Sequence, residues 1–396
     1  MTYLTTKQLV CQHCRMKNKS LVTTALIAAA LIVVIGIWIN VTRQPEDTIK
    51  IGGAYNLTGA TAVMGELQLN GSTLAIEEIN RNGGINGKKV ELVTEDTASS
   101  ATQALNAYQA LTFKGVRYVV AETSAVVGAI RQTVVDDGNL ILTPGSVTSS
   151  YYDNNQLSCR LALTARSFGS GFSALFNELG YKRVITLLPD NEYGRSVAEE
   201  FKKTYASTGG QVVFAEFYPA SADAGDYRTN LAKVKSQQAG ADVILYVQTT
   251  NPVEVMLKQF KEVGLTIPVV SDIYTINNSG LKDRSLANGI RYVDYEYVAA
   301  PSETDSAVTK DFKSKYKARY GADPVYLAAA HYDAIILLAE AIDNVGDNPQ
   351  LVAKYISALK SYDAITGALS FDADCEVDRS MVFREVVEGK IRNLTI

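Results

Sequence analysis

Histidine is scarce in this chain, with only His13 and His331 in 396 residues. His13 lies in the N-terminal tail, so a catalytic or metal-binding histidine cluster is hard to assemble in the folded part. Positive charge is not in excess either: the net charge is −4 and the pI is near 5.5, which argues against a nucleic-acid-binding surface. A P-loop, a nucleophile elbow and a His–carboxylate arrangement are all missing. We therefore expect no enzyme activity, no cofactor, no metal and no nucleic acid.

Cysteine is also rare, at four residues. Cys11 and Cys14 form CQHC, but one such pair without a second pair of ligands does not make a zinc site, and we assign it no role. Hydrophobic residues make up 47% of the chain and charged residues 20%, the balance of a globular protein rather than a disordered one. The length allows two or three compact units.

One long hydrophobic run is present, the uncharged segment Leu21–Ile39. A helix of about 20 residues spans a bilayer core of roughly 30 Å, and the basic residues before the run predict that the C-terminal part faces outward. Further hydrophobic residues follow the alanines of this run, which favours an uncleaved anchor over a cleaved signal. We expect a cytoplasmic tail at 1–20, the anchor or signal at 21–39 and a linker at 40–48. Met16 is an alternative start.

The remaining chain alternates between strand and helix patterns. Ile49–Asn82 predicts a strand, a Gly/Thr/Asn loop and an amphipathic helix that ends at Gly83-Gly84. Further strands are expected at Lys89–Glu95, Tyr118–Ala121, Leu140–Leu142, Arg183–Leu188, Gln211–Phe217, Val243–Val247, Pro268–Ser271 and Val293–Val298. A helix-rich tail and two last strands, Gly367–Phe371 and Val382–Val387, complete the pattern. The alternation predicts an α/β fold with parallel sheets covered by helices on both faces.

Two stretches carry a family resemblance. IKIGGAYNLTGATAVMG with INRNGGINGKK, and then LLPDNEYGRSVAEEFK, resemble the leucine/isoleucine/valine-binding family of type I periplasmic (solute) binding proteins of ABC importers. The likeness runs from about residue 49 to 390. It implies two lobes, each a parallel sheet flanked by helices, joined by three crossover hinge strands that close around a ligand. Lobe 1 would comprise 49–162 and 297–370, and lobe 2 would comprise 164–295 and 372–396.

Candidate ligand-binding residues of lobe 1 lie at the carboxyl ends of strands, where open α/β sheets place their sites. Asn56 and Met64 belong to the first loop, whose alternative interpretation is a Gly-rich turn without ligand. Ser124 begins a helix and matches the family's carboxylate-binding serine. It is equally placed to cap that helix, and the two roles are compatible. The third loop supplies Gly145, Ser146, Val147 and Thr148, where the family often has an Ala-Thr pair.

Lobe 2 supplies Tyr193, Thr250 and Asp272. By resemblance, Tyr193 closes over the ligand, although a loop tyrosine without a ligand is the plainer alternative. Thr250 falls near a position that is aromatic in some members of the family. Asp272 is the candidate partner of a ligand ammonium group, but an aspartate after a strand is most often a helix cap or a turn residue. Strict alignment moves the family's carboxylate one residue on, to Ile273.

The two remaining cysteines, Cys159 and Cys375, lie beside crossover strands in the arrangement that the resemblance implies. Outside the cytoplasm an even pair of cysteines suggests a disulfide, and two free thiols remain the alternative.

The resemblance implies a substrate-binding protein, and the hydrophobic segment predicts that it is extracytoplasmic and held at the cell membrane by its N-terminal helix. It captures a small solute, by resemblance a branched-chain amino acid, and delivers it to an ABC transporter permease. The alternative function is a membrane-anchored extracellular sensing domain for a small amide or carboxylate. The short cytoplasmic tail has no room for a catalytic output module, which favours transport.

Overall fold

The computed structural model describes residues 48–148, 157–220, 225–248, 253–277, 281–299, 301–303 and 305–394. Ile49–Ile396 is a compact unit, separate from Met1–Thr48. The predicted tail at 1–20, the hydrophobic segment at 21–39 and all but the last residue of the linker at 40–48 lie outside the described residues. Within the described ranges, no helix is both long and apolar enough to cross a bilayer.

The first sheet has five parallel strands in the order β2-β1-β3-β4-β5. The strands are β1 (Ile49–Tyr55), β2 (Val90–Asp96), β3 (Tyr118–Ala121), β4 (Leu140–Thr143) and β5 (Ser158–Arg160). β3 and β4 are buried along their whole length. A strand covered on both faces has no solvent-exposed face, so it needs no alternating polar residues. This explains the uninterrupted hydrophobic runs YVVA and LIL.

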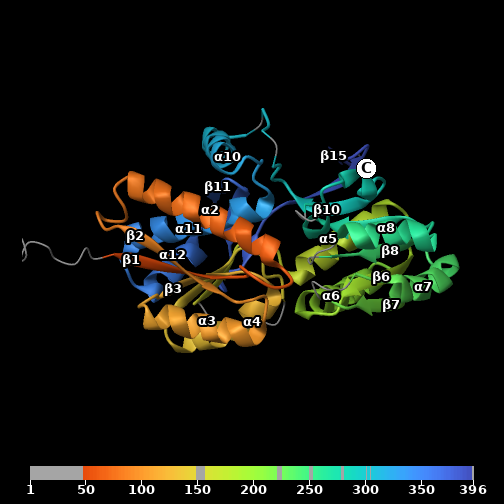
Figure 1. Cartoon of the computed structure of the whole chain (residues 1–396), viewed down its shortest axis with the longest axis horizontal. Coiled ribbons are helices and arrows are strands. Elements are labelled where there is room, and N and C mark those ends of the chain that lie inside the picture. Colours follow the sequence, from red (N-terminus) through yellow and green to blue (C-terminus); the bar gives the residue numbers. More distant parts are fainter. Residues whose placement is uncertain are drawn as a thin grey trace, which may run out of the picture. The chain divides into compact units, whose positions relative to one another are not determined.

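Helices cover both faces of this sheet (Figure 1). On one face α3 (Ala101–Phe113) and α4 (Ser124–Asp136) share a hydrophobic cluster with Val119 and Ala121 of β3. The neighbouring β3 residues Tyr118 and Val120 point to the other face. That face is covered by α2 (Ala62–Arg81) and by two helices from far along the chain, α11 (Tyr326–Val345) and α12 (Pro349–Ala358).

The contact between α2 and α11 depends on a glycine. A Cβ atom at Gly71 would lie 2.0 Å from the carbonyl oxygen of Ala328, so the two helix backbones can approach this closely only without a side chain there. The preceding helix α10 (Ala307–Tyr320) is tied to α2 by the ion pair Lys315–Glu78. The helix-rich tail therefore packs against the first sheet.

The second sheet has seven strands in the order β15-β14-β10-β9-β8-β6-β7. Five strands are parallel: β6 (Arg183–Pro189), β7 (Gln211–Tyr218), β8 (Val243–Tyr246), β9 (Val269–Asp272) and β10 (Arg291–Tyr295). The last two strands, β14 (Met381–Val387) and β15 (Lys390–Asn393), add to its edge in antiparallel orientation. The flanking helices are α5 (Ala165–Glu178), α6 (Glu192–Ser207), α7 (Arg228–Gln237) and α8 (Val253–Val263). A single-turn helix, α9 (Ile273–Ile276), follows β9.

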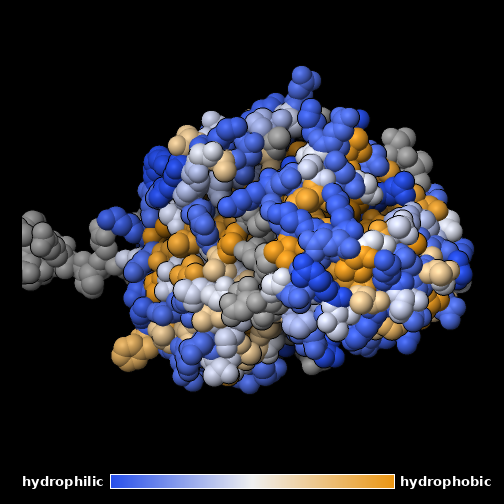
Figure 2. Space-filling model, turned by 45° about the vertical axis from the view of Figure 1, so that its right-hand side comes forward, coloured by the Kyte–Doolittle hydropathy of each residue, from blue (hydrophilic) through white to orange (hydrophobic). Residues whose placement is uncertain are grey.

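The chain passes between the two sheets three times. It leaves β5 for α5, returns from β10 towards α10, and leaves a small three-stranded sheet for β14. That small sheet consists of β11 (Tyr362–Ala364), β12 (Gly367–Phe371) and β13 (Val377–Asp378). The predicted two-lobed α/β fold, with each lobe built on a sheet flanked by helices, is confirmed. On the face shown in Figure 2 hydrophilic residues predominate, with smaller groups of hydrophobic ones between them.

A disulfide links Cys159 of β5 to Cys375 in the turn between β12 and β13, so the pairing is confirmed over two free thiols. Both cysteines are fully buried. The amide of Arg160 donates to the carbonyl of Cys375 at 2.9 Å, and its guanidinium lies 2.9 Å from the carboxylate of Glu376. The disulfide therefore holds the first and third crossings side by side.

Candidate ligand site

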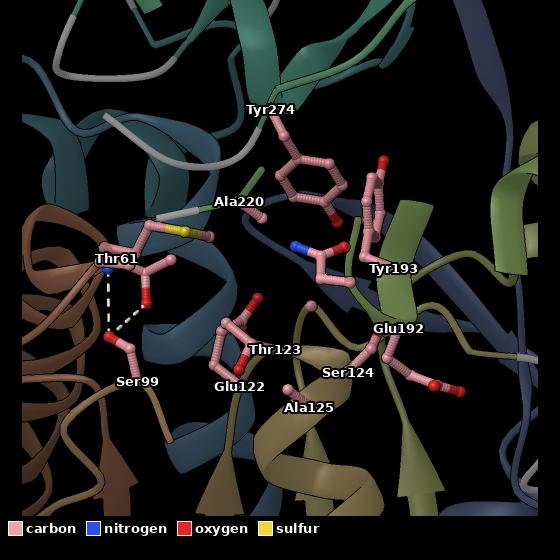
Figure 3. A pocket seen from close by; sticks show the side chains of 14 residues that line it. Thr61, Ser99, Glu122, Thr123, Ser124, Ala125, Glu192, Tyr193, Ala220 and Tyr274 are labelled. Atoms are coloured by element: carbon pink, nitrogen blue, oxygen red, sulfur yellow. Dashed lines mark hydrogen bonds between the residues drawn. The ribbon is translucent and has the colours of Figure 1, made fainter. Parts of the chain in front are cut away.

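A cavity of about 120 Å³ lies where loops from the two sheets meet. From the side of the first sheet it is lined by Ala60, Thr61, Met64, Ser99, Glu122, Thr123, Ser124, Ala125 and Gly145. From the side of the second sheet it is lined by Asn191, Glu192, Tyr193, Ala220 and Tyr274. In Figure 3 the rings of Tyr193 and Tyr274 lie on one side of the cavity, and Glu122, Thr123 and Ser124 lie on the other. These residues follow the carboxyl ends of strands, where the sequence pattern predicted a site.

The first predicted loop is divided between the cavity and the layer behind it. Met64 lines the cavity and also a smaller apolar cavity beside it. Asn56 is buried behind the wall, where its side-chain oxygen accepts from the hydroxyl of Thr97 and its amide nitrogen donates to Thr123 at 3.4 Å. The backbone of Asn56 donates to Gln68 at 3.2 Å. Asn56 therefore stabilises the loop through hydrogen bonds behind the wall, and Met64 faces the cavity.

The N-terminus of α4 opens onto the cavity. Ser124, its first residue, lines the cavity and is 3% exposed. The preceding residue, Thr123, has a positive φ of 59° and makes no side-chain hydrogen bond to the helix. The first amides of a helix have no partner within it, and its dipole favours negative charge at this end. A carboxylate in this cavity would therefore meet backbone donors at the start of α4.

The third predicted loop contributes one residue to the cavity wall, Gly145. Ser146 and Thr148 are buried and are not among the lining residues, and their hydroxyls have no hydrogen-bond partner among the described residues. Val147 belongs to the hydrophobic core, and its carbonyl accepts from the amide of Ala165 at 2.6 Å. The carbonyl of Thr148 accepts from Arg160 at 2.9 Å.

On the side of the second sheet, Tyr193 lines the cavity and donates its hydroxyl proton to Asp272. Asp272 is fully buried and caps α9, because its Oδ1 accepts from the amide and the hydroxyl of Thr275, each at 2.9 Å. Burial raises the pKa of Asp272 to about 6. Asp272 is not one of the described residues that line the cavity. Thr250 lies outside the described residues.

Several wall residues were not among the predicted ones. Thr61 and Ser99 are joined by hydrogen bonds of 3.1 Å from the Thr61 amide and 2.9 Å between the hydroxyls (Figure 3). Tyr274 follows Asp272 by two residues, and its hydroxyl lies 3.3 Å from that of Tyr295. Glu122 directly follows β3, at the carboxyl end of a strand. This position is the feature of the sequence from which Glu122 could have been predicted as a site residue.

Glu122 is a carboxyl group enclosed almost completely by protein, at 1% exposure. Its Oε2 lies 3.5 Å from Nε2 of His331 on α11. Burial raises the pKa of Glu122 to about 8 and lowers the pKa of His331 to about 4, since both charged forms lose hydration. Gly145 makes room for this carboxyl, because a Cβ atom there would lie 1.4 Å from Oε1 of Glu122.

Two α/β lobes with a cavity between them, connected by three crossings, define a class of proteins that close around small ligands. The profile of the periplasmic binding protein family matches residues 48–390, and the chain belongs to this family. The resemblance found in the sequence is thereby confirmed.

Individual relatives agree with this assignment. The chain is 26% identical over 330 residues to a leucine-, isoleucine-, valine-, threonine- and alanine-binding protein of Pseudomonas aeruginosa, covering 82% of this chain and 86% of that one. Its fold is similar to a branched-chain amino acid transporter substrate-binding protein of Streptococcus pneumoniae in complex with isoleucine (TM-score 0.75, 24% identity, 87% and 98% covered). It is also similar to a solute-binding protein of an ABC transporter from R. palustris in complex with benzoate (TM-score 0.75, 19% identity, 88% and 95% covered).

Proposed function

We propose that this protein is an extracytoplasmic substrate-binding protein that captures a small amino acid between its two lobes and delivers it to an ABC importer. One observation supports this most: the cavity is walled by both lobes, with Ser124 and Glu122 on one side and Tyr193 and Tyr274 on the other. A solute held there would contact both lobes at once, so it would favour the closed arrangement.

The chemistry of the wall fits an amino acid with an apolar side chain. The start of α4 offers backbone donors to a carboxylate, Glu122 offers an acceptor to an ammonium group, and Met64 and Tyr274 offer apolar surface. The relative from Pseudomonas aeruginosa is named for leucine, isoleucine, valine, threonine and alanine, and the one from Streptococcus pneumoniae is named for branched-chain amino acids. A branched-chain amino acid is therefore the ligand we propose, and binding rather than catalysis is the role.

Lobe 1 is proposed to comprise 49–162 and 297–370, and lobe 2 to comprise 164–295 and 372–396. The three crossings between the sheets would then be the hinge. The disulfide Cys159–Cys375 ties two of the three crossings together, which would restrict the motion to bending about a fixed axis.

The hydrophobic segment 21–39 is proposed to hold the protein at the membrane, with the binding domain outside and an ABC permease as partner. Its uncharged composition and the basic residues before it support this orientation. The alternative function, an anchored sensor for a small amide or carboxylate, is favoured by the position of Glu122, whose Oε2 faces Nε2 of His331 at 3.5 Å and would carry a proton there. A protonated Glu122 would donate to an uncharged amide or a carboxylate rather than pair with an ammonium group.

Thermal unfolding of the soluble 46–396 fragment in the presence of single solutes tests the proposal. A ligand that binds only the folded state at about 100 times its Kd adds about 2.7 kcal/mol of stability, which raises Tm by roughly 5 °C. We expect leucine, isoleucine or valine to produce this shift. A shift with amides or benzoate and with no amino acid would support the alternative, and no shift with any solute would contradict both.

A further inference from the structure

The ionisable side chains that line the cavity, among the described residues, include acidic groups but no basic ones. Among the described residues that line it there are two carboxyl groups and no lysine, arginine or histidine. The segments that interrupt the description between 49 and 394 contain no lysine, arginine or histidine in the sequence either. Of the two carboxyls, Glu192 is exposed at the start of α6, whereas Glu122 is buried. A buried carboxylate without a cation is costly, so Glu122 needs either a proton or a positively charged ligand.

His331 does not provide that cation. Its Nδ1 lies 3.0 Å from the carbonyl oxygen of Leu327, an atom that can only accept, so Nδ1 carries the proton of the neutral ring. Nε2 is then left with a lone pair, and it faces Oε2 of Glu122 at 3.5 Å. Two acceptors do not bind each other, so this arrangement suits a proton on Glu122 that points towards His331. The geometry therefore favours the neutral carboxylic acid form of Glu122 when no cation is beside it.

The other candidate acceptor for a ligand ammonium group is already in use. Both oxygens of Asp272 accept hydrogen bonds, one from Tyr193 and the other from Thr275. Asp272 is fully buried behind the wall. Asp272 is not among the described residues that line the cavity, whereas Glu122 forms part of its wall.

We infer that Glu122, on the lobe 1 side, receives the ammonium group of the ligand and gives up a proton when the ligand binds. This inference rests on the proposed function, because it requires a ligand with an amino group. The zwitterion enters with its ammonium group intact, the O–H bond of Glu122 breaks, and the proton leaves to solvent. The Glu122 carboxylate and the ligand ammonium form the ion pair, so one proton is released for each ligand bound.

Glu122 belongs to the cavity wall and has a pKa raised to about 8, whereas Asp272, behind the wall with a pKa raised to about 6, is already mostly ionised at pH 7. His331 stays uncharged, since burial lowers its pKa to about 4. The phenols of Tyr55, Tyr274 and Tyr326 are close enough to feel the charge of Glu122, and burial raises the pKa of each above its usual value. With the pKa of Glu122 raised to about 8, the carboxylate form that binds ammonium is the minor form at pH 7. Affinity should therefore increase with pH.

Isothermal titration of the full chain with L-leucine tests this. At pH 7, titrations in phosphate and in Tris, which differ in ionisation enthalpy, should show release of about one proton per leucine, and Kd should fall roughly tenfold or more from pH 6 to pH 8. Glu122→Gln should weaken leucine binding and abolish both the proton release and the pH dependence. Glu340→Gln, an exposed position on the same helix as His331, should change none of these quantities.

The outcomes separate this inference from the proposed function. Leucine binding without proton release, or with affinity that falls as pH rises, would contradict the inference alone, and the wild-type protein suffices for this result even if the variant does not fold. Binding of 4-methylpentanoate, which lacks the amino group, as tightly as leucine would contradict it as well. Failure of every amino acid to bind at any pH would overturn the proposed function and the inference together.

Discussion

The hydroxyl of Tyr193 donates a hydrogen bond to Oδ2 of Asp272, and the other oxygen of that carboxylate caps the helix that carries Tyr274. One buried carboxylate thus fixes two of the aromatic residues that wall the cavity on the side of the second sheet. The rings of Tyr193 and Tyr274 meet edge to face, with centroids 5.8 Å apart. This part of the wall is held together by contacts within the protein itself.

Tyr193→Phe keeps the ring and removes the donor. A buried carboxylate then loses a hydrogen bond, so the free energy of unfolding in urea should fall by about 1.5–3 kcal/mol. The matched control is Tyr355→Phe, whose hydroxyl donates to the exposed Glu340 at 3.3 Å and whose loss should cost less than about 1 kcal/mol. Equal effects of the two substitutions would show that the Tyr193–Asp272 contact is not formed.

Gly145→Ala should impair ligand binding. Its Cβ atom would lie 1.4 Å from Oε1 of Glu122, so the carboxyl must move out of its position in the cavity wall. We expect the Kd for leucine in a calorimetric titration to rise at least tenfold, about 1.4 kcal/mol. Gly240→Ala, where a Cβ would meet no atom within 4 Å, is the control and should bind normally. Unchanged affinity of Gly145→Ala would mean that Glu122 takes no part in binding.

The stability of the ligand-free protein should decrease from pH 7 to pH 8. The pKa of Glu122 is raised in the folded state to about 8, from 4.5 in the unfolded chain, so its contribution is present below pH 4.5 and lost as the pH rises through 8. Its share of the loss between pH 7 and 8 is about 1 kcal/mol. The Glu122→Gln variant lacks this contribution. Between pH 7 and 8 its free energy of unfolding should therefore fall by about 1 kcal/mol less than that of the wild-type protein. If the free energy of unfolding changed equally with pH in the wild-type protein and the variant, the raised pKa of Glu122 would be contradicted.

Removing the disulfide should destabilise the fold without preventing ligand binding. Cys159 and Cys375 are 216 residues apart, and opening a loop of that length lowers the free energy of unfolding by about 2–5 kcal/mol. The double variant Cys159→Ser/Cys375→Ser should show this loss in urea titrations. Mass spectrometry of a non-reduced digest should contain the cross-linked peptide 159–375, and its absence would rule out the bond.

The elements that the sequence predicted best are those with a strong local pattern. β1 was expected at Ile49–Tyr55 and is found there, because an almost fully buried strand before a Gly-rich loop leaves little ambiguity. The strand expected at Val293–Val298 begins two residues earlier, as β10 (Arg291–Tyr295). Its start is set by pairing with β9 and β14, and that information lies elsewhere in the chain.

The candidate site was predicted in part. Met64, Ser124, Gly145 and Tyr193 line the cavity, because loops after parallel strands converge at one edge of each sheet. The sequence could not show that Asp272 accepts a hydrogen bond from Tyr193, a residue 79 positions away. Nor could it show that Glu122 faces His331, since that contact depends on how α11 returns to the first sheet.

A crystal structure of the protein grown with L-leucine tests the central claim most directly. We predict leucine between Ser124 and Tyr193, with its carboxylate at the start of α4, its side chain against Met64 and Tyr274, and its ammonium group within hydrogen-bonding distance of Glu122. Leucine bound outside this cavity, or an empty cavity at saturating leucine, would contradict the account.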